Sequence, residues 1–572
     1  MIEKLEQFVN NLNKTRVYLI LANIFLVLFL ILFNNFKVIP LRIGDFIFFA
    51  VLTLAFALYR PGWAFLFFTG TIALENINLA PTDLGISVRP YQLLGALVIL
   101  AVAIRFFSKK LYFKLPKFEW YDYTLLVVVF SGFLSIINAP EKIASFKLSI
   151  IFATFFALYY LVRIYIQNSE DLKRIVPFFI GSGVVIIFYG IWQNWRFMHN
   201  LTNFETMPGR PNGTFLEADW LGMFLVLFIS VIYVLIYFRH SESRQEVGMK
   251  NLLNNTTSNN FEQIPAYRQA GFAPAGSRPQ DDGLIANYQL LVTKLFLYLL
   301  LTSSFVLLIL TVSRSAWLGA FFATFIFLWA IFTDFKFRNL PAGEAGWQWK
   351  KTIQIKLAII CSLAISLAIV YVFYLTNFQL FNRIQSTGTG MQKITISCTE
   401  KSNLPESIDN VSELNKYNCR HINLEEIELE KKAGNSVYEI YRKDPNVQTR
   451  SEIYKKSWNE IRDHPILGIG WGSISSVLGK DERGTGLNSS NIFLEIWLGT
   501  GIIGFSAFII FWFYIIFNAI KNFYFSSESL QKTMYLLIII SWFGMTVANL
   551  FNAGILLGFL WVYMGIAVKE KA

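Results

Sequence analysis

Residues 17–34 read VYLILANIFLVLFLILFN, a run without a single charged side chain. A helix of this length rises about 27 Å, close to the roughly 30 Å hydrocarbon core of a bilayer. Similar runs recur along the 572 residues, of which 54% are hydrophobic and 15% charged. A soluble protein carries about a quarter charged residues. The sequence therefore predicts an all-α fold, a polytopic transmembrane helical bundle.

Fourteen apolar segments can be distinguished, which predicts about 12–14 membrane spans. They cover roughly residues 17–34, 43–59, 62–78, 90–106, 122–138, 148–164, 175–195, 218–238, 289–312, 315–333, 354–376, 490–518, 533–549 and 551–568. Only Arg60-Pro61-Gly62 separates the second segment from the third. These two segments form either a tight hairpin or one broken helix.

Lysines and arginines gather in alternate loops. If the N-terminus is inside, the inner loops include the basic stretches 105–117, 163–174 and 336–351 and the basic C-terminal end. This asymmetry follows the positive-inside rule and predicts a multi-pass protein of the plasma (inner) membrane with both termini cytoplasmic. The net charge of +12 has the same explanation. Nucleic acid is not an expected partner, because no basic stripe alternates with exposed aromatic residues.

Two long polar stretches divide the chain into regions. The first region, 1–376, is transmembrane and includes residues 239–288, which are rich in Asn, Ser, Gly and Pro and predict a disordered cytoplasmic loop. Residues 377–489 fall outside and predict one large folded extracytoplasmic loop. Residues 490–572 hold the C-terminal transmembrane helices.

The outer loop has the pattern of a folded segment. Arg450, Tyr454, Trp458 and Ile461 share one face of a predicted helix, and a glycine-rich turn follows over residues 468–472. Cys398 and Cys419 also lie in this loop. They would face an oxidising space and could pair in a disulfide.

Four arginines depart from the positive-inside pattern. Arg89, Arg210, Arg314 and Arg450 fall at outer ends of apolar segments or in the outer loop. A single arginine near the interface most often anchors a helix by snorkelling. Four at one level, three of them beside Gly, Ser or Thr, indicate a clamp for a lipid-linked phosphate or pyrophosphate, since the guanidinium fork binds phosphate through two hydrogen bonds.

Acidic residues and a histidine lie at the same predicted level. Glu217 and Asp219 follow Arg210 closely, and either pair with an arginine or position and deprotonate an acceptor hydroxyl. His464 follows the predicted helix of the outer loop, where it either favours the helix dipole or takes part in catalysis. The sequence has no Asp-x-Asp pair, no nucleotide-binding glycine motif and no His/Cys cluster. It therefore predicts chemistry without a metal or cofactor.

Four ordered stretches carry a resemblance to a known family. They are RPNGTF at 210–215, SRSAWLG at 313–319, the segment from Arg450 to HPILGIG at 464–470, and NIFLEIWL at 491–498 with Gly501 and Gly504 after it. In these stretches, in their order and in the large outer loop, the chain resembles the O-antigen ligase and polymerase family of bacterial membrane glycosyltransferases. The resemblance implies a fold of the GT-C type.

The resemblance also implies substrates. The donor would be a glycan on undecaprenyl diphosphate, and the acceptor a hydroxyl of a lipid, another glycan or a protein, all at the outer membrane surface. Arg210, Arg314 and Arg450 would grip the pyrophosphate. Ligases of the lipopolysaccharide type carry a histidine before the asparagine of the fourth stretch, where this chain has Ser490. The candidate catalytic residues are therefore Glu217, Asp219, His464 and Ser490.

Two other functions fit the pattern less well. A transporter of lipid-linked sugars or polysaccharide would be expected to show inverted repeats and broken helices at the membrane midplane, and no internal repeat is evident. A non-catalytic subunit of an envelope assembly is the third possibility, which Ser490 favours. The leading prediction is a glycosyltransferase, either a ligase or a polymerase.

Overall fold

The computed structural model describes residues 2–111, 113–199, 201–202, 204–206, 209–258, 279–337, 342–373, 375, 391–399, 404–409, 411–422, 427–443, 445–480, 486–526 and 528–568. Helices dominate these residues, and ten of them are long and apolar enough to cross a membrane. Three shorter apolar helices are present as well. The prediction of an all-α, polytopic membrane bundle is confirmed.

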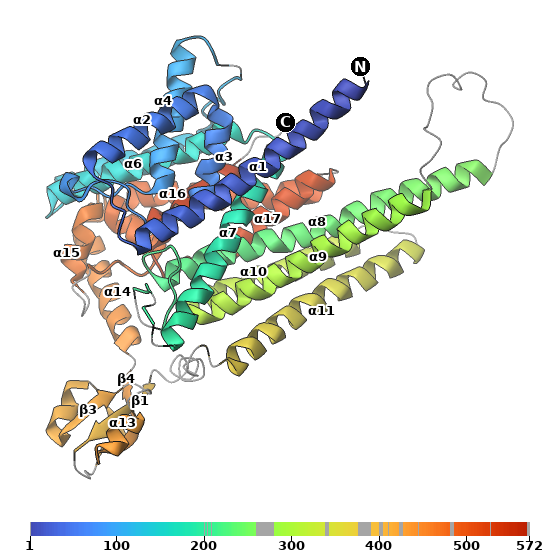
Figure 1. Ribbon diagram of the computed structural model, residues 1–572. Coiled ribbons are helices and arrows are strands. Elements are labelled where there is room, and N and C mark those ends of the chain that lie inside the picture. Colours follow the sequence, from blue (N-terminus) through green and yellow to red (C-terminus); the bar gives the residue numbers. More distant parts are fainter. Residues whose placement is uncertain are drawn as a thin grey trace.

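The helices follow one another in antiparallel order (Figure 1). Before the outer loop they are α1 (Ile2–Asn35), α2 (Ile43–Tyr59), α3 (Pro61–Thr71), α4 (Pro90–Phe107), α5 (Trp120–Leu134), α6 (Lys142–Tyr165), α7 (Ser169–Met198), α8 (Ala218–Ser258), α9 (Pro279–Leu310), α10 (Arg314–Phe337) and α11 (Ala342–Val372). After it come α16 (Ile492–Phe525), α17 (Ser529–Asn549) and α18 (Gly558–Ala567).

The loops that form the candidate site all lie at one end of the bundle. Because the helices alternate in direction, the ends of α1, α3, α7, α9 and α17 meet the starts of α4, α8, α10, α16 and α18 there. We call this end the site face. The labels of the two chain ends lie on the side of the molecule away from the small β-sheet (Figure 1).

Helices α8, α10 and α17 form the centre of the bundle. The span of α8 is apolar on every side and is mostly enclosed by other helices, as expected for a helix without a polar face. Close packing of α10 on α17 depends on small residues: a Cβ atom at Gly319 would lie 2.6 Å from the carbonyl oxygen of Gly544. Small residues let helix backbones approach in this way inside membranes.

The apolar segment at 62–78 is helical only as far as Thr71. The chain continues as a buried loop over residues 72–81, in which the amide groups of Glu75 and Asn76 both donate to the carbonyl oxygen of Thr214, at 2.9 and 2.8 Å. Irregular backbone at membrane depth requires such internal partners. The predicted helix is therefore shorter than its hydrophobicity suggests, because residues far along the chain replace its hydrogen bonds.

The segment expected to be disordered, 239–288, carries the ends of two helices. Helix α8 continues to Ser258 and α9 begins at Pro279, while residues 259–278 lie outside the described part. This corrects the prediction at both ends of the segment. A long helix can extend readily, because each further turn adds hydrogen bonds without a new nucleation step. The charged residues after 238 are compatible with a helix that continues beyond the apolar segment.

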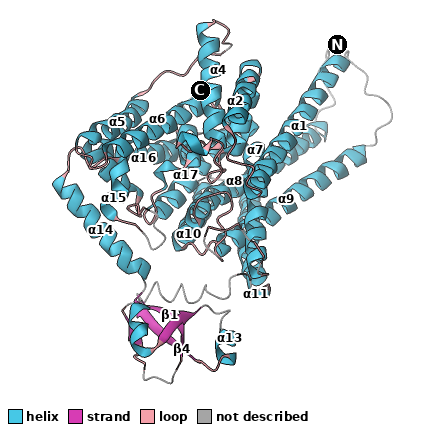
Figure 2. Ribbon diagram, turned by 60° about the vertical axis from the view of Figure 1, so that its left-hand side comes forward, coloured by secondary structure: helices cyan, strands magenta, loops and turns pink. Residues whose placement is uncertain are grey.

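The described residues of the outer loop are folded. A four-stranded sheet has the order β2-β4-β1-β3, formed by β1 (Met391–Cys398), β2 (Ser407–Ile408), β3 (Cys419–Ile422) and β4 (Ser436–Lys443). Helices α13 (Ile427–Lys432), α14 (Pro445–Asp463) and α15 (Ile474–Leu478) complete the loop. Figure 2 shows α14 running between the small sheet and α15.

Helix α14 matches the predicted helix of the outer loop, but of the four residues on the predicted face only Ile461 is fully buried. Ile453, Ser457 and Ile461 are buried, whereas Trp458 is 52% exposed. The spacing of four residues between buried positions is that of a helix with one buried face, and here that helix contacts α16 and α15.

Candidate functional site

Two of the predicted arginines meet at the turn between α9 and α10. The Arg210 Nε donates to the carbonyl oxygen of Thr311 at 3.0 Å, and its Nη2 lies 3.2 Å from Asp219 Oδ1. Arg314 is the first residue of α10, directly after that turn, and is half-buried. The structure therefore brings Arg210 and Arg314 to one place from two separate loops of the site face.

Arg450 reaches the same region through the connection between α17 and α18, residues 550–557. Its Nη2 donates to the carbonyl oxygen of Phe551 at 3.4 Å. The next residue of the connection, Asn552, is buried and donates to Ser315 Oγ at 2.7 Å. Ser315 is the second residue of α10. The connection thus joins the start of α14 to the start of α10.

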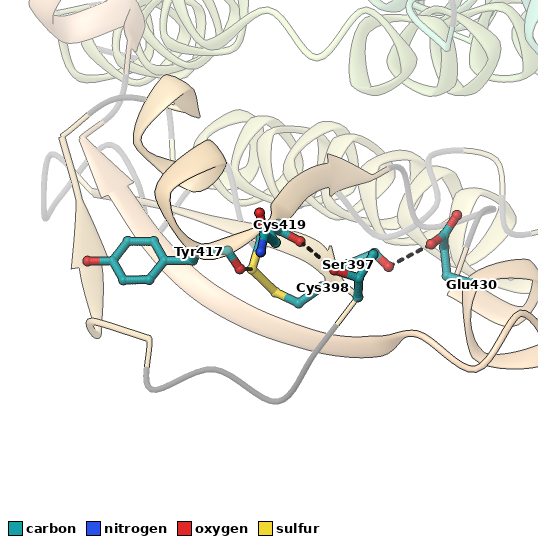
Figure 3. The surroundings of a disulfide bond; sticks show 7 residues. Ser397, Cys398, Tyr417, Cys419 and Glu430 are labelled. Atoms are coloured by element: carbon teal, nitrogen blue, oxygen red, sulfur yellow. Dashed lines mark hydrogen bonds between the residues drawn. A yellow bond between two sulfur atoms is a disulfide. The ribbon is translucent and has the colours of Figure 1, made fainter.

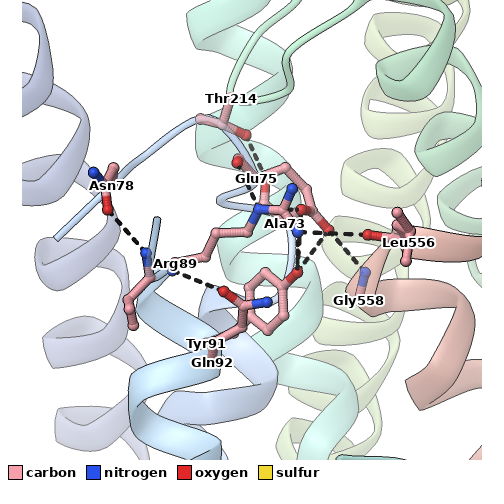
Figure 4. A network of polar contacts seen from close by, with 10 residues as sticks. Ala73, Glu75, Asn78, Arg89, Tyr91, Gln92, Thr214, Leu556 and Gly558 are labelled. Atoms are coloured by element: carbon pink, nitrogen blue, oxygen red, sulfur yellow. Dashed lines mark hydrogen bonds and ion pairs between the residues drawn. The ribbon is translucent and has the colours of Figure 1, made fainter. Parts of the chain in front are cut away.

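Arg89 is built into a different network, at the far end of the same connection (Figure 4). Its Nε lies 3.0 Å from Glu75 Oε2, and its Nη1 donates to Tyr91 Oη at 3.2 Å and to the carbonyl oxygen of Leu556 at 3.4 Å. The Glu75 carboxylate also accepts hydrogen bonds from Tyr91 Oη and from the amide of Gly558. Arg89 therefore braces three loops against one another.

Ser490 lies beside Arg450 on the site face. It has a φ of 50° and precedes Asn491, whose side chain caps α16. The Tyr454 hydroxyl, one helical turn after Arg450, donates to the carbonyl oxygen of Ser490 at 3.4 Å, and burial raises the pKa of that hydroxyl. Asn491 Nδ2 donates to the carbonyl oxygen of Leu550 at 3.0 Å. The fourth family-like stretch is thereby tied to the same connection.

The other candidate catalytic residues are placed differently. Asp219 pairs with Arg210, and Glu217 precedes α8, where its carbonyl oxygen accepts the first amide hydrogen bonds of that helix. His464 follows the last turn of α14. At 1.5 Å per residue it lies about 21 Å along the helix axis from Arg450. The structure does not bring His464 together with the arginines.

Two residues of the site face escaped the sequence analysis. Asn552 lies inside a segment that the hydrophobicity pattern joins into one span. Glu205 precedes the RPNGTF stretch, and its Oε2 accepts from the amide of Gly209 at 2.8 Å. Burial raises the pKa of Glu205 to about 7. The signal available for Asn552 was a polar residue inside an apolar run, and that for Glu205 was an acidic residue five positions before the RPNGTF stretch.

The small sheet contains a disulfide between Cys398 and Cys419 (Figure 3). The two cysteines are partners in the pairing of β1 with β3. Beside them, Ser397 Oγ and Arg420 Nη2 both donate to Glu430, at 2.6 and 2.5 Å. Hydrogen bonds from Ser397, Asn435 and Arg420 lower the pKa of Glu430 to about 2. The bridge and this exposed network fix the sheet edge.

Within the described residues, no group of three or more His, Cys, Asp or Glu side chains is arranged to hold a metal ion. The cations that this site places at the starts of α10 and α14 are the arginine side chains of Arg314 and Arg450. The absence of a metal from the reaction stays a prediction from the sequence.

One comparison with known proteins gives a match. The family model described as O-antigen ligase matches residues 297–509, a range that includes Arg314, Arg450, His464 and Ser490 but not Arg210. The resemblance inferred from the sequence is thereby confirmed. Neither the search of curated proteins nor the search of solved structures found a match.

Proposed function

Because the chain carries an O-antigen ligase domain at residues 297–509, we propose that it transfers a glycan from a polyprenyl-diphosphate carrier to an acceptor hydroxyl. The observation that carries this proposal is a set of linked contacts. Arg210 binds the turn after α9, which Arg314 follows, and Arg450 binds the 550–557 connection, which itself contacts the start of α10. Guanidinium groups suit a diphosphate because they stay charged and donate two parallel hydrogen bonds.

The reaction would place the diphosphate at the start of α10. There the backbone amides of the first helical turn favour an anion, and Arg314 adds a full charge. The acceptor hydroxyl attacks the anomeric carbon as the bond to the diphosphate oxygen breaks. The developing negative charge on the leaving diphosphate is stabilised by the arginines without a metal ion. The hydroxyl proton passes to a nearby base or to water.

The structure favours different roles among the candidate residues. Asp219 would hold the Arg210 guanidinium in position, since the two are already paired at 3.2 Å. Glu217 is the neighbouring carboxylate and remains our candidate for the base. Ser490 would line the acceptor side of the site. We propose no direct role for His464, since it lies about 21 Å along α14 from Arg450. Arg89 would support the loops from behind.

The reaction would take place at the outer surface of the plasma membrane. The Cys398–Cys419 bridge supports this orientation, because disulfides persist in oxidising compartments. The basic loops at the opposite end of the bundle support it as well. In this orientation the N- and C-termini are cytoplasmic.

The test is a transfer assay with the full-length protein in nanodiscs. The lipid-linked glycan of the producing cells is labelled and supplied with candidate acceptors in the presence of EDTA. We expect glycan transfer together with release of the carrier diphosphate. Movement of intact lipid-linked glycan across vesicles, without transfer, would instead support the transporter.

Matched arginine variants test the clamp. Arg210→Lys and Arg314→Lys should each lower donor use by about tenfold or more, because lysine keeps the charge but loses the fork. Arg105→Lys is the control, since Arg105 also donates to carbonyl oxygens, those of Leu58 and Tyr59, but at the opposite end of the bundle. Full activity of both site-face variants would refute the clamp.

A further inference from the structure

A cavity of about 340 Å³ with a mixed polar and apolar lining lies on the site face beside the RPNGTF stretch. We call it the α1–α7 cavity. Its size falls in the range of small-molecule sites, roughly 300–1,000 Å³. The walls come from the end of α1, from α7 and from the loops before α4 and before α8, and include Asn34, Asn76, Tyr189, Phe204, Glu205 and Thr206.

The loop that forms one wall of the cavity is held firmly against α7. Gln193 is fully buried; its Oε1 accepts from the amide of Gly213 at 2.7 Å, and its Nε2 donates to the carbonyl oxygen of Phe204 at 3.1 Å. The Arg196 guanidinium lies over the rings of Trp192 and Phe204, at 4.8 and 5.7 Å from their centroids. The cavity wall is therefore pre-formed, which lowers the entropic cost of binding.

The wall groups combine two chemistries. Amides, hydroxyls and a carboxylate give donors and acceptors in close alternation, and the rings of Tyr189 and Phe204 give apolar faces with polar surroundings. One lysine, Lys37, and one glutamate, Glu205, contribute opposite charges to the lining. This composition suits a neutral ligand rich in hydroxyl groups better than a phosphate, for which the nearby arginines are the matching partners.

We propose that the α1–α7 cavity binds a saccharide unit. One contact links the cavity to Arg210: the cavity residue Glu205 accepts a hydrogen bond at Oε2 from the amide of Gly209, the residue before Arg210. A sugar in the cavity would lie on one side of this loop, with the diphosphate on the other. Whether the bound sugar belongs to the donor or to the acceptor glycan is a question that rests on the proposed function. Saccharide binding in the cavity does not depend on that function.

Binding is tested without turnover. The probe is the free oligosaccharide released by mild acid from the lipid-linked glycan of the producing cells, titrated calorimetrically into the full-length protein in detergent. Glu205→Gln and Asn34→Ala should each weaken binding by about tenfold, the usual effect of losing a good hydrogen bond to a ligand. Glu141→Gln, an exposed glutamate at the start of α6 on the same face, should leave the dissociation constant unchanged.

Two results would overturn the proposal: no oligosaccharide binding by the unmodified protein, or the same affinity in the cavity variants as in the control. The transfer assay then assigns the source. A raised KM for the lipid-linked donor indicates a donor glycan in the cavity, and a raised KM for the acceptor indicates an acceptor glycan. Oligosaccharide binding without any transfer would refute the proposed function and leave the cavity proposal standing.

Discussion

Replacing Asp219 with asparagine distinguishes a residue that positions an arginine from one that takes a proton. The Asp219 and Arg210 side chains are 27% and 13% exposed and 3.2 Å apart. Such a part-buried pair should be stronger than a surface pair, which contributes about 0–1 kcal/mol. We expect Asp219→Asn to lower kcat/KM for glycan transfer about tenfold, which corresponds to about 1.4 kcal/mol.

The same change in an Arg210→Ala background gives the decisive comparison. If Asp219 acts by holding Arg210, its replacement should then cost at most about twofold, since coupled residues show non-additive effects. A general base would contribute roughly 100-fold or more, in both backgrounds. The assay is transfer of labelled glycan by full-length protein in nanodiscs, with thermal unfolding of each variant to exclude misfolding. Equal losses in the two backgrounds would refute the positioning role.

Three further changes test the loops around the site. Cys398→Ser with Cys419→Ser should destabilise the small sheet by about 3 kcal/mol and expose residues 391–443 to limited proteolysis. Burial raises the pKa of Glu205 to about 7 from its ordinary 4.5, so the folded state holds this proton more tightly than the unfolded state does. The free energy of unfolding should therefore fall from pH 5 to pH 8. In the Glu205→Gln variant, thermal melts should show a smaller fall over the same range. Gly501→Ala should lower the free energy of unfolding by about 2–4 kcal/mol, because Gly501 has a φ of 65° and an added Cβ would meet the backbone of Ile466. The melting temperature measures this loss.

Matched controls accompany these changes. Gly44→Ala, at a helical glycine with open space around it, should leave the melting temperature nearly unchanged. Cys361→Ser removes the free cysteine and should leave the small sheet resistant to protease. For Glu205, the useful quantity is the difference between the parent protein and the variant at each pH, since other titrating groups cancel. A variant that keeps the full pH dependence would contradict the assignment to Glu205.

Helix α16 is interrupted at Gly501, where the backbone approaches the turn after α14 closely. The amide of Ile502 donates to the carbonyl oxygen of Pro465 at 2.9 Å, and the amide of Ile469 donates to that of Leu498 at 2.8 Å. The turn after α14 is thus inserted into α16. The family-like stretches at 464–470 and 491–498 therefore contact each other directly in the folded protein.

The sequence by itself determined the class of the protein and predicted the level at which the site lies. Long uncharged runs require helices in a bilayer because unpaired backbone groups are too costly there. Four arginines, at predicted outer ends of apolar segments or in the predicted outer loop, indicated where the site would be. The family-like stretch around Arg314 was readable because serine and arginine are unusual within an otherwise apolar segment.

Only the tertiary structure decided what each charged residue contacts. The hydrogen bond from Arg89 to the carbonyl oxygen of Leu556, and the link from Asn552 to Ser315, join residues that lie far apart in the chain. The 551–568 run reads as one span, yet it is an irregular connection followed by the short helix α18. Hydrophobicity indicates which residues are removed from water. It does not indicate which loops contact each other, because those contacts depend on packing between helices that are distant in the sequence.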